Sequence, residues 1–272
     1  MTFQFYLGTH CMNHVEQTNQ PLFISINRLY KRKKPFKNQP LICLDSGAFS
    51  QLHKHGKWTS TPQEYISHIK RIQHDLNLSF QWVAPQDWMC EPFMIKKTGL
   101  SVKEHIHRTV DNFLILRKLT QNTDIHIIPV LQGFDLDEYQ YCFDLYSQHI
   151  DLTAEQTVGI GSVCRRESTN DIYKIIQHFY DLNLSIHGFG VKINGLKKYH
   201  HLLQSSDSMA WSFNARYNVE HCSIHTQNPT TKNCANCLQY ALEWTQKIHT
   251  TTNTSLPSSN MHSAAQGGFD EE

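Results

Sequence analysis

Acidic residues stand beside several of the short apolar runs in this sequence. The run LICL leads directly into Asp45, the run FQWVAPQ leads into Asp87, and Asp207 precedes the apolar run 208–213. A carboxylate held at the end of a strand can act as a nucleophile or as a general acid or base. It can equally be the N-cap of the helix that follows, so one such aspartate alone does not define a site.

A glutamine and several glycines fall at comparable positions. The run IIPVL leads into Gln132 and Gly133, and the run TVGIG leads into Ser162. Further glycines lie at or beside run ends, at Gly47, Gly159, Gly161, Gly188 and Gly190. Glycine lets a flat ligand approach the backbone closely, whereas the alternative is tight packing where strands end. A site for a planar, hydrogen-bonding ligand explains the amide, the acids and the glycines together.

Four residues near the end of the chain have the types and the spacing of metal ligands. They are Cys222, His225, Cys234 and Cys237. Two close pairs separated by a short loop suit tetrahedral Zn²⁺, and four protein ligands leave no open position, so we expect a structural zinc ion. His221 and His249 are alternatives to His225 as the fourth ligand.

Short runs of β-branched, aromatic and aliphatic residues predict the strands that would position these groups. Near-continuous apolar runs are typical of parallel strands that are covered on both faces. Eight such runs occur, at 3–8, 22–27, 41–46, 80–87, 125–133, 157–163, 186–192 and 208–213.

Helices are predicted between most of these strands. The run Thr59-Ser60-Thr61 before Pro62 is typical of a helix start. The predicted helices cover 62–76, 101–119, 135–150, 169–182 and 196–203. Alternating strands and helices predict an α/β fold with a parallel sheet, and eight strands favour a (β/α)₈, TIM-like barrel. The first two connections contain little helix, so the alternation is weakest there.

The sequence pattern changes after Ser212. We therefore predict a catalytic barrel over 1–215, followed over 216–249 by a zinc-binding subdomain whose helix, starting at Cys237, packs on the barrel. Residues 250–272 are rich in Thr and Ser and end in Asp-Glu-Glu, which predicts a disordered tail.

Composition narrows the class of protein. The chain has 272 residues, of which 39% are hydrophobic and 18% charged, as in ordinary globular proteins. No apolar run suits a membrane span and no secretory signal is visible, so we expect a cytoplasmic protein with no membrane partner. The remaining cysteines are then predicted to be free thiols. They are Cys11, Cys43, Cys90, Cys142 and Cys164.

An ordered set of motifs resembles the tRNA-guanine transglycosylases. Residues 45–50 are similar to that family's DSGG-aromatic-Gln segment, and residues 85–92 to its second acidic motif. Residues 131–133 match its Val-Gln-Gly strand, 158–162 take the place of its Gly-Gly-Leu segment, and 187–191 are similar to its Leu-Met-Gly-Val strand. The motifs follow the family's order over roughly residues 40–240.

The chain differs from the tRNA enzymes in two respects, which indicate a particular branch of that family. The chain has no room for an added RNA-binding domain, and its segment 206–216 differs from the tRNA enzymes. Together with the stretch 233–244, these features resemble the 7-deazaguanine DNA transglycosylases of phages and bacterial modification islands. The resemblance implies exchange of guanine in DNA for a 7-deazaguanine base, with the 7-cyano form (preQ0) as the default.

The resemblance also implies different catalytic roles for two of the acids. Asp207 would be the nucleophile that holds the sugar as a covalent glycosyl-enzyme. Asp45 would be the general acid and base that protonates the departing base and deprotonates the incoming one. This is two-carboxylate retaining chemistry in which a base replaces water as the acceptor.

The same resemblance implies a base pocket. Its residues would be Asp87, Gln132, Gly133, Gly161, Phe49 and Phe189. Asp87 would accept hydrogen bonds from the ring N–H and the amino group of guanine, while Gln132 and the backbone around Gly161 would read the carbonyl side. Phe49 and Phe189 would stack on the base, although core packing explains Phe189 equally well.

A duplex substrate would have to present its guanine by flipping it out of the stack. The net charge is only +1, so DNA would be held by local basic residues. The predicted contacts are Arg165, Arg166, Lys192 and Arg216. A compact tRNA-guanine transglycosylase and a catalytically silent nucleic-acid-binding barrel are the alternatives, and the oligomeric state is not predicted.

Overall fold

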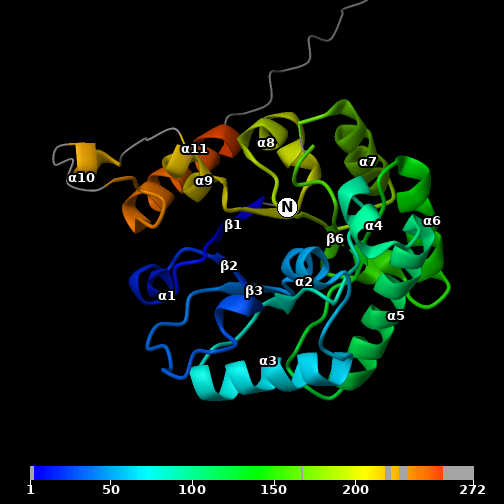
Figure 1. Ribbon diagram of the computed structural model, residues 1–272. Helices are drawn as coiled ribbons and strands as arrows, with labels where there is room; N and C mark the ends of the chain where they lie inside the picture. Colours follow the sequence, from blue (N-terminus) through cyan, green and yellow to red (C-terminus); the bar gives the residue numbers. More distant parts are fainter. Residues whose placement is uncertain (1–2, 167, 218–221, 227–231, 254–272) are drawn as a thin grey trace, which may run out of the picture.

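Eight parallel strands form the centre of the molecule. The computed structural model describes residues 3–166, 168–217, 222–226 and 232–253. The strands are β1 Gln4–Gly8, β2 Leu22–Ser25, β3 Ile42–Asp45, β4 Trp82–Val83, β5 Val130–Leu131, β6 Val158–Ile160, β7 Ile186–Gly188 and β8 Ser205–Ser208. They form one curled sheet in the order β4-β3-β2-β1-β8-β7-β6-β5, so the first strand pairs with the last (Figure 1).

The residues just before β5 bridge the two edge strands of this sheet. The Val83 N–H donates to the His126 carbonyl at 2.8 Å, and the Ile128 N–H donates to the Val83 carbonyl at 3.2 Å. Val83 and Ile127 thereby form a parallel bridge between β4 and the approach to β5. The predicted α/β class is confirmed, and the curled parallel sheet fits a TIM-like barrel.

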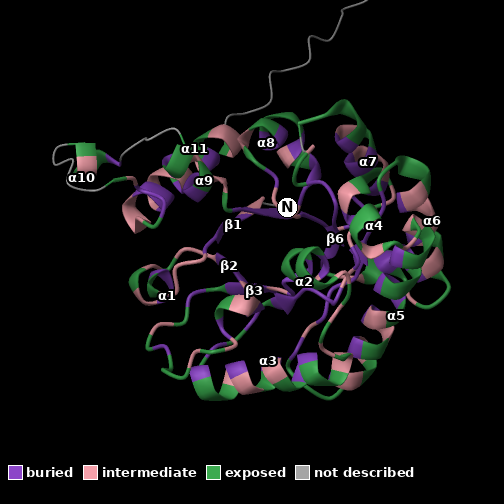
Figure 2. Cartoon of the chain, viewed as in Figure 1, coloured by how far each residue is buried: buried purple, intermediate pink, exposed green. Residues whose placement is uncertain are grey.

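Helices cover the outer face of the sheet (Figures 1 and 2). The outer helices are α3 Pro62–Leu76, α5 Val102–Thr120, α6 Leu136–Ser147, α7 Asn170–Asp181 and α8 Ile193–Tyr199. Two shorter helices, α2 Ala48–His55 and α4 Pro92–Thr98, follow β3 and β4. Only α1 Asn13–Gln17 and a 3₁₀ turn at Ile26–Arg28 occupy the first two connections, as the weak alternation there indicated.

The start of α3 follows from its sequence. The Thr61 side chain accepts from the Glu64 N–H, and the Glu64 carboxylate accepts from the Thr61 N–H, while Pro62 occupies the first helical position. This capping box satisfies two donors that a helix start leaves unpaired. The predicted bounds of this helix, 62–76, are confirmed.

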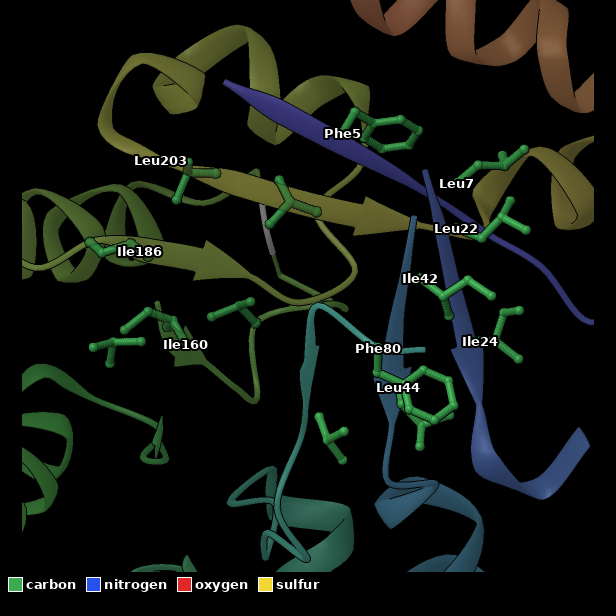
Figure 3. Packing of buried hydrophobic residues seen from close by; sticks show 14 of the residues in the cluster. Phe5, Leu7, Leu22, Ile24, Ile42, Leu44, Phe80, Ile160, Ile186 and Leu203 are labelled. Atoms are coloured by element: carbon green, nitrogen blue, oxygen red, sulfur yellow. The ribbon is translucent and has the colours of Figure 1, made fainter. Parts of the chain in front are cut away.

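Alternating residues of each strand enter two different cores. Outward side chains pack between the sheet and the helices, and Figure 3 labels six of them on their strands: Phe5, Leu7, Leu22, Ile24, Ile42 and Leu44. The residues between them fill the inside of the curled sheet: Tyr6, Phe23, Cys43, Trp82 and Val130. Because successive side chains of a strand point to opposite faces, this period of two also fixes which residues at the strand ends face inward.

The eighth strand lies earlier than predicted. β8 is the polar segment Ser205–Ser208, and most of the predicted run 208–213 belongs to helix α9 Ala210–Tyr217. The segment is a strand because it pairs with β1 on one side and with β7 on the other. Trp211 and Ala215 are buried at the helical spacing of four residues. Asp207 therefore lies within a strand and does not precede one.

The C-terminal part of the described chain packs on the barrel. Helix α11 Leu238–Asn253 contacts α8, α9 and β1, and the short helix α10 Ser223–Thr226 contacts α11. Because α11 runs to Asn253, the first four residues of the predicted tail, 250–253, are helical. The rest of that predicted tail, 254–272, lies outside the described residues. Among the described helices, none combines the length and the apolar character needed to cross a bilayer.

Candidate active site at the mouth of the barrel

The period of two along the strands brings the predicted site residues to one place. Asp45 lies two residues after the inward Cys43, Gln132 two after the inward Val130, and Asp207 two after Ser205. All of them stand at the carboxyl ends of parallel strands, which meet at the same edge of the sheet. Asp87 follows β4 at this edge as well. The three acids therefore converge on the mouth of the barrel.

Groups inside the barrel contact one of the two carboxylate oxygens of Asp207. Its Oδ1 accepts from the Gly190 N–H at 2.9 Å and lies 3.4 Å from His187 Nε2. His187 is fully buried, and its Nδ1 lies 2.9 Å from Ser205 Oγ. Both of these contacts fall on Oδ1, and neither involves Oδ2.

Asp45 is an acid whose proton is held more tightly than usual. Burial raises the pKa of Asp45 to about 6, and the negative charge of Asp207 adds to this rise. Hydrogen bonds from Ser25 and from the Gly47 N–H oppose it. A pKa near neutrality suits a group that must give and take a proton at physiological pH.

Asp87 forms a hydrogen-bonded group with its neighbours. Its Oδ2 accepts from Gln132 Nε2 at 2.6 Å, and its Oδ1 accepts from Ser46 Oγ at 3.2 Å. Burial raises the pKa of Asp87 to about 7, the Asp45 carboxylate contributes to the rise, and the bonds from Gln132 and Ser46 lower it. Gln132 is fully buried, so in this structure it supports Asp87 from behind.

Gly161 provides the space that the Gln132 amide occupies. A Cβ atom at Gly161 would stand 2.2 Å from Gln132 Nε2. The Gly161 N–H donates to the Leu131 carbonyl and its own carbonyl accepts from Tyr139 Oη, so both backbone groups have protein partners. Gly133 packs with its α-carbon against the start of α6 at Tyr139. Both glycines are thus explained by packing beside the amide.

The two predicted stacking residues lie in different surroundings. Phe189 is half-buried and packs inside the barrel, with its ring centroid 5.9 Å from that of Phe23 and 4.7 Å from that of His187. Phe49 is 41% exposed on α2, and its ring lies 6.2 Å from that of Phe93. Phe189 therefore forms the floor of the mouth, whereas Phe49 stands at its rim, where its ring stacks on that of His53 with a centroid distance of 5.4 Å.

The predicted DNA contacts are spread around the same rim. The Arg165 guanidinium lies 4.4 Å from the Phe93 ring centroid and 5.4 Å from that of Phe49. Arg166 lies over Phe134 at 4.0 Å. Lys192, which is exposed, precedes α8, and Arg216 is exposed in the last turn of α9. Three of these cations thus lie at helix starts or in loops beyond the strand ends. Arg216 is the exception, because it lies in the last turn of α9.

The predicted metal ligands form a compact cluster. The side-chain ligand atoms of Cys222, His225, Cys234 and Cys237 all lie within 4.8 Å of one another. The sulfurs of Cys222 and Cys237 are 3.8 Å apart, and His225 Nδ1 is 3.2 Å from the sulfurs of both Cys222 and Cys234. Tetrahedral zinc with Zn–S bonds of ~2.3 Å places two sulfurs ~3.8 Å apart, so this donor set fits the ion. Of the rival ligands, His249 is not part of the cluster and His221 lies outside the described residues.

The raised pKa values predict how stability depends on pH. Asp45 and Asp87 hold their protons up to about pH 6 and 7 in the folded protein, whereas an unfolded Asp releases its proton near ~4. Their favourable contribution is therefore complete below about pH 4 and is lost as the pH rises through 6 and 7. We expect the free energy of unfolding to fall from pH 5 to pH 8 by less in Asp87→Asn than in the wild type, by on the order of 1–3 kcal/mol.

Urea unfolding at both pH values measures this difference. The change of the histidines with pH is common to both proteins and cancels in the comparison. Asp111→Asn, which alters an exposed carboxylate on α5, serves as the control and should follow the wild type. An equal fall in Asp87→Asn and in the wild type would contradict the assignment of a raised pKa to Asp87.

Several neighbours of the candidate site were not assigned a role from the sequence. His187 and Glu91 were not singled out, and Ser162 was only placed at a strand end. A signal for His187 was present: it stands two residues before Phe189, so a strand there turns both side chains to the same face. Nothing in the sequence alone indicated that Glu91 is buried.

The fold and the mouth define a class of protein: a parallel α/β barrel whose strand ends bring several acids to one partly buried site. The family model DpdA, described as DeoxyPurine in DNA protein A, matches residues 1–271. The chain belongs to this family, and its predicted resemblance to the 7-deazaguanine DNA transglycosylases is confirmed. The membership supports a role in deazapurine modification of DNA and a transglycosylase type of enzyme.

Other known proteins add little to this assignment. No curated protein matches the chain. Among solved structures, the chain is similar to the YdjI aldolase from Escherichia coli K12, with 10% identity over 92% of each chain and a TM-score of 0.39. A likeness at that level carries no argument about function.

Proposed function

We propose that the protein exchanges guanine in DNA for a 7-deazaguanine base, with 7-cyano-7-deazaguanine (preQ0) as the expected one. The observation that carries the proposal is the convergence of Asp45, Asp87 and Asp207 at one mouth, in a chain of the DpdA family. An exchange needs a nucleophile, an acid that also serves as a base, and a reader of the base edge. The three acids have surroundings that suit these three tasks.

In the first step, Asp207 Oδ2 attacks the C1′ carbon of a flipped 2′-deoxyguanosine. A C–O bond forms as the C1′–N9 bond breaks, and the electron pair of the broken bond leaves with the base. The departing guanine takes a proton from Asp45, whose raised pKa keeps that proton available. The Gly190 N–H remains bonded to Oδ1, which becomes the carbonyl oxygen of the glycosyl ester.

In the second step, the incoming 7-deazaguanine gives its N9 proton to the Asp45 carboxylate. Its nitrogen attacks C1′, and the bond to Asp207 Oδ2 breaks, so the enzyme returns to its starting state. Asp87 binds both bases by accepting from the ring N–H and the exocyclic amino group. Phe49 at the rim covers one face of the base, and the floor at Phe189 bounds the other.

The rim supplies the contacts to the phosphates of DNA. Arg165, Arg166 and Lys192 at the rim, together with Arg216 in the last turn of α9, carry the positive charge that binds phosphates, and their contribution weakens as salt rises. The cluster of Cys222, His225, Cys234 and Cys237 would hold a structural zinc ion. Zinc there would fix the segment after α9 and take no part in the exchange.

Exchange assays with DNA and with tRNA, run side by side, test this function. Purified protein is incubated with preQ0 and a substrate labelled in its guanines, and both the released guanine and the digested nucleosides are measured by mass spectrometry. We expect release and insertion with DNA only. Exchange with tRNA alone would overturn the assignment to DNA. Exchange with neither substrate would favour a catalytically silent, nucleic-acid-binding barrel.

A further inference from the structure

A fourth acid lies next to the site and has no task in the exchange. Glu91 follows Asp87 by four residues and stands at the start of α4, where its side chain caps no helix N–H. Its side chain is buried, with only 6% of the residue exposed. Its Oε2 lies 3.0 Å from Ser162 Oγ. A buried carboxyl group without a chemical task is costly, so its surroundings should show what it does.

Ser162 Oγ has three polar neighbours and a single proton. It accepts from the Cys90 N–H at 2.8 Å, and it lies 2.6 Å from Gln132 Oε1 and 3.0 Å from Glu91 Oε2. Gln132 Oε1 can only accept, so the hydroxyl proton belongs to that short contact. The contact with Glu91 is then a hydrogen bond only if Glu91 is protonated and donates to Ser162 Oγ.

The surroundings of Glu91 agree with a protonated carboxyl group. Burial raises the pKa of Glu91, while the charges of Arg165 and Arg166 oppose the rise. The backbone of Ser162 has a φ of 56°, in the left-handed region that a serine rarely adopts. This conformation costs free energy, and it holds the hydroxyl group between Glu91 and Gln132.

We infer that Glu91 acts as a positioning residue: through Ser162 it fixes the Gln132 amide so that Asp87 stays a hydrogen-bond acceptor on both oxygens. The chain of donors runs from the Glu91 O–H to Ser162 Oγ, from the Ser162 O–H to Gln132 Oε1, and from Gln132 Nε2 to Asp87 Oδ2. This inference rests on the proposed function, in which Asp87 reads the base.

The orientation of the amide decides which purine edge fits. With Nε2 toward Asp87, the carboxylate accepts from two adjacent donors, the ring N–H and the 2-amino group of a guanine-type base. With the amide reversed, Oε1 would face Asp87 and require it to be protonated. The single proton of Asp87 is then directed to Gln132 Oε1, so only one oxygen remains to accept from the base. A guanine-type edge loses one hydrogen bond, whereas a 2,6-diaminopurine edge, which offers one donor beside a bare ring nitrogen, loses none. Glu91 thereby selects the guanine type.

Binding of two matched bases tests the inference. The affinities for 7-deazaguanine and 7-deaza-2,6-diaminopurine are measured by calorimetry at pH 8 in the wild type, Glu91→Gln and Glu91→Ala. We expect the wild type to prefer 7-deazaguanine. Glu91→Ala should reduce the preference by about tenfold, the effect of one net hydrogen bond. Glu91→Gln should keep it, because its amide can donate to Ser162 as the protonated acid does.

Gly161→Ala provides a second route to the same result. Its added Cβ would displace the Gln132 amide, so it should lower the preference without touching Glu91. Gly161→Ala remains informative if Glu91→Ala fails to fold, because the base preference of Glu91→Gln can then be compared with that of Gly161→Ala.

The outcomes separate this inference from the proposed function. An unchanged preference in Glu91→Ala, or an equal loss in Glu91→Gln and Gly161→Ala, would overturn the inference. A wild type that prefers neither base would overturn it as well. Absence of exchange on DNA, together with the expected changes of preference, would count against the proposed function and support the role of Glu91.

Discussion

Asp207→Asn is expected to abolish base exchange, with a fall in rate on the order of 10⁴-fold or more, as for other enzymes that lose their nucleophile. The amide is nearly isosteric with the carboxylate and can still accept from the Gly190 N–H, so the fold should remain. It cannot form the glycosyl ester. Release of labelled guanine from DNA measures the rate, and a protein–DNA adduct on a denaturing gel detects the ester.

Two further variants make this result specific. Asp111→Asn, on the exposed face of α5, should leave exchange and adduct unchanged. Asp45→Asn should slow exchange through the loss of proton transfer, although the nucleophile is intact. Full exchange by Asp207→Asn would remove Asp207 from the nucleophile role, and an adduct that persists in it would point to another residue.

Loss of the metal ligands is expected to have the second largest effect. Cys237→Ser should lower the zinc content to below one ion per chain and reduce the melting temperature by about 5–10 °C, since ~1 kcal/mol shifts a domain of this size by ~2–4 °C. Exchange should fall with it. The reason is a contact between α9 and the cluster: Ser212 Oγ donates to the Ala235 carbonyl at 2.7 Å. Helix α9 directly follows the strand that carries Asp207.

Elemental analysis of freshly purified protein and thermal unfolding measure these effects. Cys11→Ser is the control, because Cys11 is a partly exposed cysteine outside the cluster and should retain both metal and stability. Treatment of the wild type with a strong chelator should reproduce the loss. A wild type without zinc, or a Cys237→Ser variant with a full complement of it, would contradict the zinc site.

The sequence predicted most of the elements because their patterns are local. The capping run before Pro62 and the apolar period of the longer helices require no tertiary context. The strand ends at Asp45 and Gln132 were also predictable, since long apolar runs stop there. The three cysteines of the predicted metal site followed from spacing, which left His221, His225 and His249 open as the fourth ligand, and the structure places His225 with the cysteines.

What the sequence could not predict depends on contacts between distant residues. Ser205–Ser208 contains no apolar side chain, and its strand character comes from pairing with β1 and β7. The inward side chains of Ser205 and Asp207 find their polar partners in His187 and Gly190. Helix α8 separates the two pairs of residues in the sequence. The burial of Glu91 has the same origin, because Ser162 reaches it from another strand end. Such polar groups give no periodic signal.

The pairing of β1 with β8 has a consequence for how the protein is made. The ribosome delivers β1 first and β8 last among the strands, so β1 has no partner on one side until nearly the whole barrel has been synthesised. The proposed nucleophile arrives on that final strand. On the proposed mechanism, a translation product that stops before β8 has no nucleophile and so could not break the bond between a base and its sugar.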